Sequence, residues 1–372
     1  VLGRGRPTQC PPPGTCKMSR EGKIKFSGGP SSIHAWWMVT SSILGVGMLA
    51  LPVLVMRTGV LVGALLTVAV GVVSTHVALI MVSSPLREGL VAKVALLLYC
   101  LGAMPSYLLV GSRAAGVPVV AYWLIMLIML YLRDLSTVKR ALYASSAVVW
   151  ASLGFSLVLL ALKPGTKNMA LSNAINLSSI SLLLPVLVFA YFGHGGIVSL
   201  RKSEVTPAHL KKPVYLAFGG CMLLYLAIGL IGAFKGVNLL DAFESLPLLT
   251  VYAVLAPLNS YIAYAIQASS LIRGRVRAEH LQFIIAVVTL LLSLVDPTIL
   301  NWLGFAGSLG ASVYLALPCI TVISKEKKPL RRLAAACSLM VLLAATILYL
   351  LHRAGLPLFY LKPASRGAYP CR

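Results

Sequence analysis

The sequence predicts an all-α polytopic membrane protein with eleven transmembrane helices. First, 59% of the 372 residues are hydrophobic and only 11% are charged, which excludes an ordinary water-soluble globular protein. Second, the chain contains long apolar runs of the length that a helix needs to cross about 30 Å of hydrocarbon. Third, all nine Asp and Glu residues lie between these runs or at their ends. The membrane-crossing segments are therefore expected to lack a carboxylate.

Eleven apolar runs reach this length, and each is predicted to form one membrane-spanning helix. Their approximate ranges are 33–56, 60–83, 90–112, 115–132, 141–162, 177–200, 213–234, 247–272, 280–295, 299–323 and 333–351. The third and fourth ranges are divided near the small residues from Gly111 to Gly116.

The segment 1–32 is rich in Pro, Gly, Lys and Arg and is expected to be a disordered basic cytoplasmic tail. Nothing in it has the short apolar core and cleavage site of a signal peptide. Cys10 and Cys16 lie in this tail, where a disulfide or metal clip is the alternative to free thiols. The cysteines show no metal-site pattern, so neither a metal nor a cofactor is expected. Four of them are expected to pack as small apolar residues: Cys100, Cys221, Cys319 and Cys337.

The net charge of +23 is distributed unequally between the two sides of the membrane. With the N-terminus inside, 23 of the 32 Lys and Arg residues fall in cytoplasmic segments, as the positive-inside rule requires. Because eleven spans are an odd number, the tail 352–372 is predicted to be extracellular. The basic face is expected to contact anionic lipid headgroups of the plasma membrane, and no nucleic acid.

The first predicted span contains a glycine pair and a proline, at Gly45, Gly47 and Pro52. Glycine weakens helical hydrogen bonding and proline removes it, so backbone groups there need another partner. Gly45, Val46 and Gly47 are therefore candidate substrate-binding residues, whose free N–H groups suit a carboxylate. The alternative is that these glycines only permit close helix packing.

A second interruption, Phe192-Gly193-His194-Gly195 after Pro185, lies in the sixth span. Broken helices at corresponding positions of two halves point to a transporter site. The sequence thus predicts a five-plus-five inverted repeat with broken helices 1 and 6 and one extra helix. Its domains are a first five-helix repeat at 33–162, a second at 177–323 and an eleventh helix at 333–351.

Hydroxyl groups precede the first break at Thr40, Ser41 and Ser42. Ser41 and Ser42 are candidates for binding the substrate or a cation. The alternative is that these hydroxyls bond to the carbonyl one turn earlier, as they often do in helices.

His194 lies in the second break and is the candidate for carrying a coupled proton, because imidazole titrates near neutral pH. Its alternative is a neutral histidine hydrogen-bonded for structure. His76, in the second span, has no glycine break around it, and a structural role is favoured.

The eighth span carries the largest set of polar residues, which are expected to face the bundle interior or to join helices: Asn259, Ser260, Tyr264, Gln267, Ser269 and Ser270. Ser269 and Ser270 are a candidate cation site. Tyr107 and Tyr191 are candidates for closing over a substrate, although aromatic packing accounts for them equally well.

At these residues the chain resembles the amino acid/polyamine/organocation superfamily. The likeness is to its amino acid/auxin permease and hydroxy/aromatic amino acid permease branches. The stretch from Gly45 to Pro52 is similar to their Gly-x-Gly-x-Leu-x-Leu-Pro pattern. The stretch from Pro185 to Gly195 resembles their Pro…Phe-Gly-x-His-Gly region, with one residue fewer before His194. The run from Gly304 to Pro318 is a looser likeness to a glycine-rich tenth span.

The resemblance implies a leucine-transporter-type fold and secondary uptake of amino acids driven by a proton or sodium gradient. It implies a substrate at the first break and at the second, including Phe192 and Gly193. Some members carry Asn at a sodium site where this chain has Ser41, and this difference favours the proton.

The sequence therefore predicts a proton-coupled amino acid transporter that works by alternating access, and not an enzyme. The alternatives are a sodium-coupled symporter, or a channel-like or non-transporting membrane protein of the same fold. An enzyme is disfavoured because the spans contain no carboxylate pair, metal cluster or nucleophile constellation.

Overall fold

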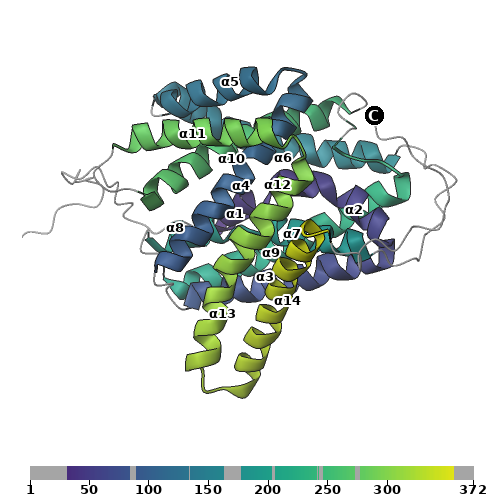
Figure 1. Cartoon of the computed structure of the whole chain (residues 1–372), viewed down its shortest axis with the longest axis vertical. Coiled ribbons are helices and arrows are strands. Elements are labelled where there is room, and N and C mark those ends of the chain that lie inside the picture. The colour runs from purple at the N-terminus through teal and green to yellow at the C-terminus, as the bar shows by residue number, and fades with distance from the viewer. Residues whose placement is uncertain are drawn as a thin grey trace, which may run out of the picture.

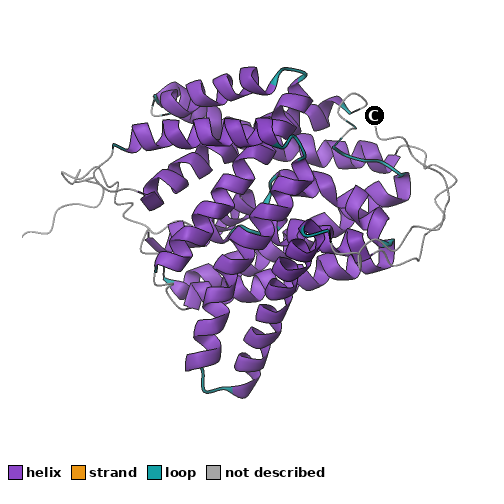
Figure 2. Ribbon diagram, viewed as in Figure 1, coloured by secondary structure: helices purple, strands orange, loops and turns teal. Residues whose placement is uncertain are grey.

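The computed structural model describes residues 32–355, except 84–88, 134, 163–176, 203–205, 241, 243–245 and 273–276. Within these residues every regular element is a helix (Figure 1, Figure 2). Cys10, Cys16 and nearly all of the two predicted tails lie outside the described residues.

The helices follow one another with short connections. They are α1 (Ser32–Ile43), η1 (Val46–Ala50), α2 (Leu51–Thr58), α3 (Val60–Ser83), α4 (Leu90–Ala115), α5 (Val119–Leu132), α6 (Ser136–Leu162), α7 (Leu177–Ala190), α8 (His194–Lys202), α9 (Pro207–Lys235), α10 (Pro247–Ile272), α11 (Ala278–Val295), α12 (Ile299–Phe305), η2 (Ala306–Ser312), α13 (Val313–Lys325) and α14 (Pro329–Arg353).

Nine helical segments of the described chain are long and apolar enough to cross a membrane, or ten when the bent pair in 35–58 counts as one span. Each of the eleven predicted ranges overlaps one of the helices or a consecutive series of them. The fourth range corresponds to α5, which has only 14 residues. A polytopic helical membrane protein is therefore confirmed, while the count of eleven crossings and the inverted repeat stay predictions.

Some predicted boundaries were wrong. Helix α4 continues to Ala115 and ends at Gly116, whose φ of 65° lets the chain turn in the left-handed conformation. Helix α9 begins at Pro207, because proline is tolerated in a first helical turn, and it also contains Pro213. Cys100, Cys221 and Cys319 are buried as expected, but Cys337 lies on an exposed face of α14.

Two long helices organise the interior. Helix α10 packs against α4 and α6, and helix α9 packs against α3, α1 and α2. Several tyrosines of the interior are fully buried, including Tyr99, Tyr107, Tyr225 and Tyr252. Because a buried phenol needs a hydrogen-bond partner, these residues bring polar groups into an otherwise apolar interior.

The segment η2 is a π-helix between α12 and α13. Its glycines lie where neighbouring helices approach most closely. A Cβ on Gly307 would overlap the Pro185 carbonyl of α7, and a Cβ on Gly310 would overlap the Tyr99 backbone of α4. The wider π turn therefore lies where α4 and α7 both press against this helix.

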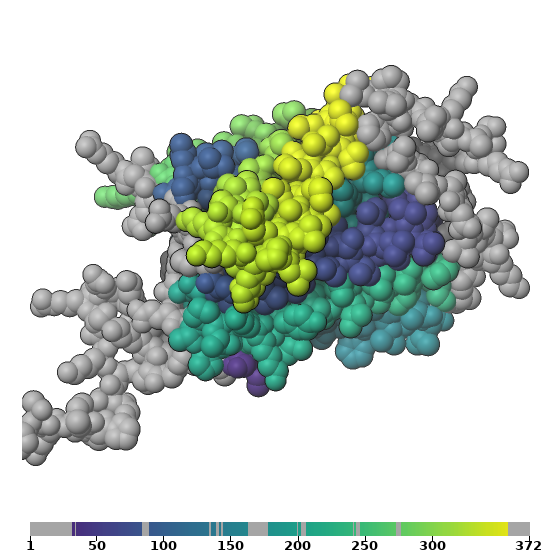
Figure 3. Space-filling view, turned by 90° about the horizontal axis from the view of Figure 1, so that it is seen from below, coloured from purple at the N-terminus to yellow at the C-terminus, as the bar shows by residue number. Residues whose placement is uncertain are grey.

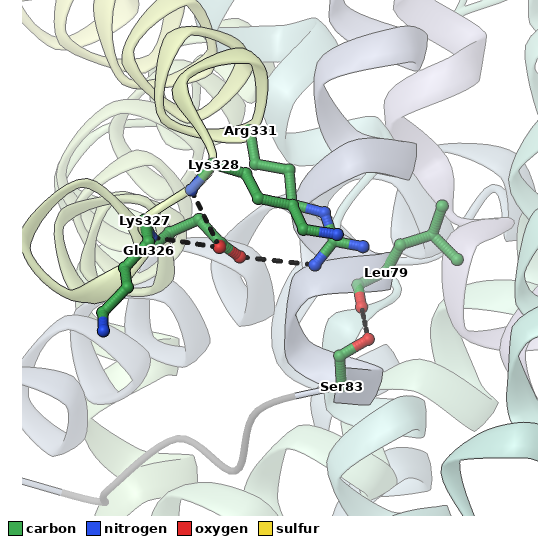
Figure 4. Close-up of polar contacts among 6 residues, drawn as sticks. All are labelled: Leu79, Ser83, Glu326, Lys327, Lys328 and Arg331. Atoms are coloured by element: carbon green, nitrogen blue, oxygen red, sulfur yellow. Dashed lines mark hydrogen bonds and ion pairs between the residues drawn. The ribbon is translucent and has the colours of Figure 1, made fainter.

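Helices α13 and α14 form a hairpin that extends beyond the other helices at the bottom of Figure 1 and lies across the face seen in Figure 3. Glu326 organises its turn (Figure 4). One carboxylate oxygen accepts the N–H groups of Lys327 and Lys328 at 3.1 and 3.2 Å, and the other accepts Arg331 at 3.3 Å. The Lys328 N–H and the Arg331 guanidinium lower the pKa of this carboxyl.

Candidate functional site

The first break interrupts the helix of predicted span 1. Helix α1 ends at Ile43, and the 3₁₀ segment η1 begins at Val46 after an extended Gly45. The two parts are bent by 44°. The hydrogen bonds of the described residues include none from the N–H groups of Gly45, Val46 or Gly47. The start of the second half-helix therefore has free donors, as the sequence predicts.

The second break separates α7 from α8. Helix α7 ends at Ala190, and the chain turns through Tyr191 to Gly193 before α8 begins at His194. The Phe192 N–H donates to the Phe189 carbonyl at 3.1 Å, and the Gly193 N–H donates to the Tyr191 carbonyl at 2.8 Å. These short-range bonds replace helical ones, so the break is a compact turn.

The two breaks touch each other through their glycines. A Cβ on Gly193 would overlap the Ile43 side chain, and a Cβ on Gly196 would lie 2.6 Å from Ser42 Oγ. A Cβ on Gly47 would lie 2.8 Å from Phe189 Cδ1. Close packing therefore accounts for Gly47 and Gly193, which was the alternative interpretation of the first-break glycines.

Two tyrosines outside the predicted site bind the backbone of the breaks. Tyr225 of α9 has its hydroxyl 2.7 Å from the Ile43 carbonyl and 3.1 Å from the Ala190 carbonyl. Tyr252 of α10 donates to the Gly45 carbonyl at 3.1 Å. Carbonyl groups freed by the breaks are thus satisfied by phenols from neighbouring helices.

A cavity of about 640 Å³ lies beside the breaks, lined by α1, α4, α6, α8 and α10. Among the described lining residues, Lys93 alone carries a charge. The other polar lining groups are hydroxyls and amides, from Ser41, Ser42, Ser146, Asn259, Ser260, Tyr264, Gln267, Ser270 and Tyr314. Lys93 and Ser270 are exposed, so the cavity opens at the start of α4 and the end of α10.

An aromatic layer adjoins the inner end of this cavity. Phe192 and Tyr264 belong to the lining. The rings of Tyr107 and Tyr264 are parallel within 3°, with centroids 5.7 Å apart, and Tyr99 lies 4.0 Å from Phe192. The Tyr99 and Tyr264 hydroxyls are hydrogen-bonded at 2.9 Å. Tyr107 also covers Gly45, where a Cβ would lie 3.1 Å from its hydroxyl.

The structure separates the other residues predicted around the first break. Thr40 and Ser42 donate to the carbonyls of Trp36 and Met38, both at 2.7 Å, which is the alternative role considered for them. Ser41 Oγ is buried beside the cavity and has no hydrogen-bond partner among the described residues. Tyr191 points to α3, where its hydroxyl donates to the Thr67 carbonyl at 3.2 Å.

His194 is fully buried and is not among the residues that line the cavity. Its Nε2 lies 3.1 Å from the Ser74 carbonyl of α3. Because a carbonyl only accepts, Nε2 carries the hydrogen in this arrangement. Nδ1 has no partner among the described residues. His76 is paired with Ser338 of α14 at 2.9 Å, in keeping with a structural role.

Ser269 and Ser270 face different surroundings. Ser269 is buried and accepts a hydrogen bond from Gln282 of α11 at 3.4 Å, whereas Ser270 is exposed and lines the cavity. Both hydroxyls donate to carbonyls of their own helix, at 2.8 and 2.7 Å. The structure does not bring these two hydroxyls together as one cation site.

Among known proteins, no family model matches the chain, and no curated protein matches it. A crystal structure of a manganese transporter from Eremococcus coleocola, in complex with an aromatic bis-isothiourea substituted compound, matches with a TM-score of 0.52 and 12% identity. The match covers 93% of this chain and 91% of that one. The likeness shows the fold of a multi-span membrane transporter.

Proposed function

We propose that this chain is a secondary active transporter that imports amino acids by alternating access. The observation that carries the proposal is the cavity, which opens at one end and leads to two broken helices in a transporter fold. A carrier exposes its site to one side at a time, whereas an open channel needs a continuous path. The buried aromatic layer at the inner end of the cavity therefore favours a carrier over a channel-like protein.

The chemistry of the breaks suits a zwitterion. The free N–H groups of Val46 and Gly47 begin the helical stretch 46–58, whose dipole favours a carboxylate at this end. The nearby ends of α1 and α7 carry the opposite partial charge, which favours an ammonium group. Ser41 Oγ, buried with no partner among the described residues, adds a hydroxyl that a substrate can engage.

The manganese transporter of similar fold suggests a metal ion as a second candidate substrate. Hard divalent cations prefer several oxygen ligands, usually with carboxylates among them. The described lining includes no Asp or Glu, and its one charge is the ammonium group of Lys93. No group of three His, Cys, Asp or Glu residues in the described chain is placed to hold a metal ion. These residues favour an amino acid.

For the coupling ion we propose the proton, with His194 as its carrier. This residue lies at the second break, and its Nδ1 has no partner among the described residues, so it can accept a proton. Sodium is the alternative, held by span 1 carbonyls with Ser269 and Ser270. The separate surroundings of these two serines weigh against it.

Uptake into proteoliposomes tests the proposal directly. Purified protein is given a panel of labelled amino acids, with proton and sodium gradients imposed separately and with Mn²⁺ entry followed by an internal metal-sensitive dye. We expect at least one amino acid to accumulate under an inward proton gradient and to be released by an uncoupler. Entry of Mn²⁺ without uptake of any amino acid would overturn the assignment.

We further propose that the protein lies in the plasma membrane with its N-terminus cytoplasmic and its basic face against anionic lipid headgroups. This orientation places the loop from Arg273 to His280 inside and the tail after His352 outside. Cysteine labelling from each side tests both positions, after the native tail cysteines have been removed. A tail that reacts only from the cytoplasmic side would refute the eleven-span arrangement.

A further inference from the structure

The Tyr225 hydroxyl lies between the two breaks. It is 2.7 Å from the Ile43 carbonyl, the last of α1, and 3.1 Å from the Ala190 carbonyl, the last of α7. A phenol has one hydrogen, so the two carbonyls share a single donor. Both belong to helix ends that have lost their own helical donors. This one side chain therefore connects the first break to the second.

The helix that carries Tyr225 is well placed to hold this position. One face of α9 presents Tyr225, Gly229 and Gly232, at helical spacing. A Cβ on Gly229 would lie 3.2 Å from Val55 of α2, and a Cβ on Gly232 would overlap Pro52. The Tyr225 ring is fully buried and packs on Tyr191, with ring centroids 5.0 Å apart. Close contact with α2 thus fixes the depth at which the phenol reaches the breaks.

We propose that Tyr225 is a positioning residue that holds the two breaks together, so that the broken helices change position as one body during transport. This inference rests on the proposed function for the word transport, but the tie itself is a statement about the fold. Without the hydroxyl, two buried carbonyl oxygens would face each other with no donor. Their separation would then be favoured, because an unsatisfied buried acceptor is costly.

The tie also has a consequence for cation binding. Carbonyls of unwound helix segments are groups that transporters use to hold sodium. Here the Ile43 and Ala190 carbonyls are occupied by the Tyr225 phenol. A coupling cation between the breaks would have to displace it, so this pair does not serve as cation ligands while the tie is formed.

Hydrogen exchange on the purified full chain tests the tie without relying on transport. Three matched variants each remove one buried hydroxyl. Tyr225→Phe removes the donor to both breaks, and Tyr252→Phe removes the donor to the Gly45 carbonyl of the first break only. Tyr122→Phe removes a donor to the Val254 carbonyl, away from the breaks. Exchange is followed in peptides that cover residues 40–48 and 189–196.

We expect Tyr225→Phe to accelerate exchange in both peptides together, by about tenfold for the loss of a buried hydrogen bond. Tyr252→Phe should accelerate the first peptide alone, and Tyr122→Phe neither. A Tyr225→Phe protein that changes one peptide only, or that matches Tyr122→Phe, would overturn the tie. In uptake assays Tyr225→Phe should raise KM more than Tyr252→Phe does. If wild-type protein carries no amino acid, the proposed function fails while the exchange result still decides the tie.

Discussion

Replacement of Gly47 by alanine tests whether the contact between the two breaks is needed for the substrate site. The added Cβ would lie 2.8 Å from Phe189 Cδ1 and 3.1 Å from the Cβ of Ala190. Carbon atoms in good contact are about 3.5–4.0 Å apart, so both neighbours are too close. The Phe189 ring has little room to move, because Tyr99 and Tyr107 lie against it with centroids 5.6 and 6.3 Å away.

Overpacking of this kind costs about 1–3 kcal/mol, which corresponds to about 5- to 150-fold in the equilibrium between the packed breaks and a separated form. If the substrate binds where the breaks meet, Gly47→Ala should weaken binding by a factor in this range. Gly47→Val, with two further methyl groups, should abolish binding and uptake while the protein still inserts.

Gly45→Ala is the matched control. Its Cβ would lie 3.1 Å from the Tyr107 hydroxyl, the far end of one side chain, so a small shift of that ring relieves the contact. Equilibrium binding of labelled amino acid to purified protein measures both variants, with thermal unfolding in detergent as the check on folding. Unchanged affinity in Gly47→Ala, or a larger loss in Gly45→Ala, would refute the reasoning.

Three other predictions concern single side chains. Lys93→Glu should increase inhibition of uptake by cationic amino acids and decrease inhibition by anionic ones by about five- to tenfold, because the charge of the cavity lining is reversed. The exposed Lys211 lies outside the cavity, and Lys211→Glu should leave this preference unchanged. His194→Gln should lose proton-driven accumulation but keep exchange between equal substrate pools, and full accumulation by this variant would exclude His194 as the carrier. Glu326 has a lowered pKa, so its carboxylate stabilises the hairpin turn above its ordinary value of 4.5, and this contribution is lost as the pH falls through the lowered pKa. Glu326→Gln should therefore speed amide exchange in the turn at neutral pH, with a difference from wild type that disappears in acid; a difference that persists there would contradict the carboxylate's role.

The positions of the two breaks could be predicted from the sequence, because glycine and proline close together in an apolar run weaken the helical hydrogen bonds at that point. The contacts of each glycine could not. Gly47 and Gly193 meet side chains of the opposite break, which lie far away in the sequence. Likewise, Ser41 and Ser42 are indistinguishable by residue type, yet only Ser42 bonds to the preceding turn.

The tyrosines show why aromatic residues were harder to assign. A tyrosine in an apolar helix has the same sequence pattern whether its hydroxyl reaches a carbonyl or a cavity. Tyr225 and Tyr252 were therefore missed, and Tyr191, a candidate for the substrate site, points to α3. The requirement that a buried phenol be hydrogen-bonded was the available signal, but the partner depends on tertiary packing.

The π segment η2 also escaped prediction. It accommodates one more residue per turn than an α-helix, and this leaves no periodic mark in a run of Gly, Ala and Ser. Gly307 and Gly310 indicated a close approach of some neighbour, which the structure identifies as Pro185 and Tyr99.

Helix α5 has a consequence for the lipids around the protein. Its 14 residues extend only about 21 Å, at about 1.5 Å per residue, against about 30 Å of hydrocarbon in a typical bilayer. Tyr122 and Trp123 hold it to backbone carbonyls of α10 and α11, while Val120 and Ile128 are exposed on its outer side. A crossing helix of this length is matched only if the bilayer thins beside it, at a cost of a fraction of a kcal/mol per Å. Activity in reconstituted membranes should therefore depend on acyl-chain length and be highest with short-chain lipids.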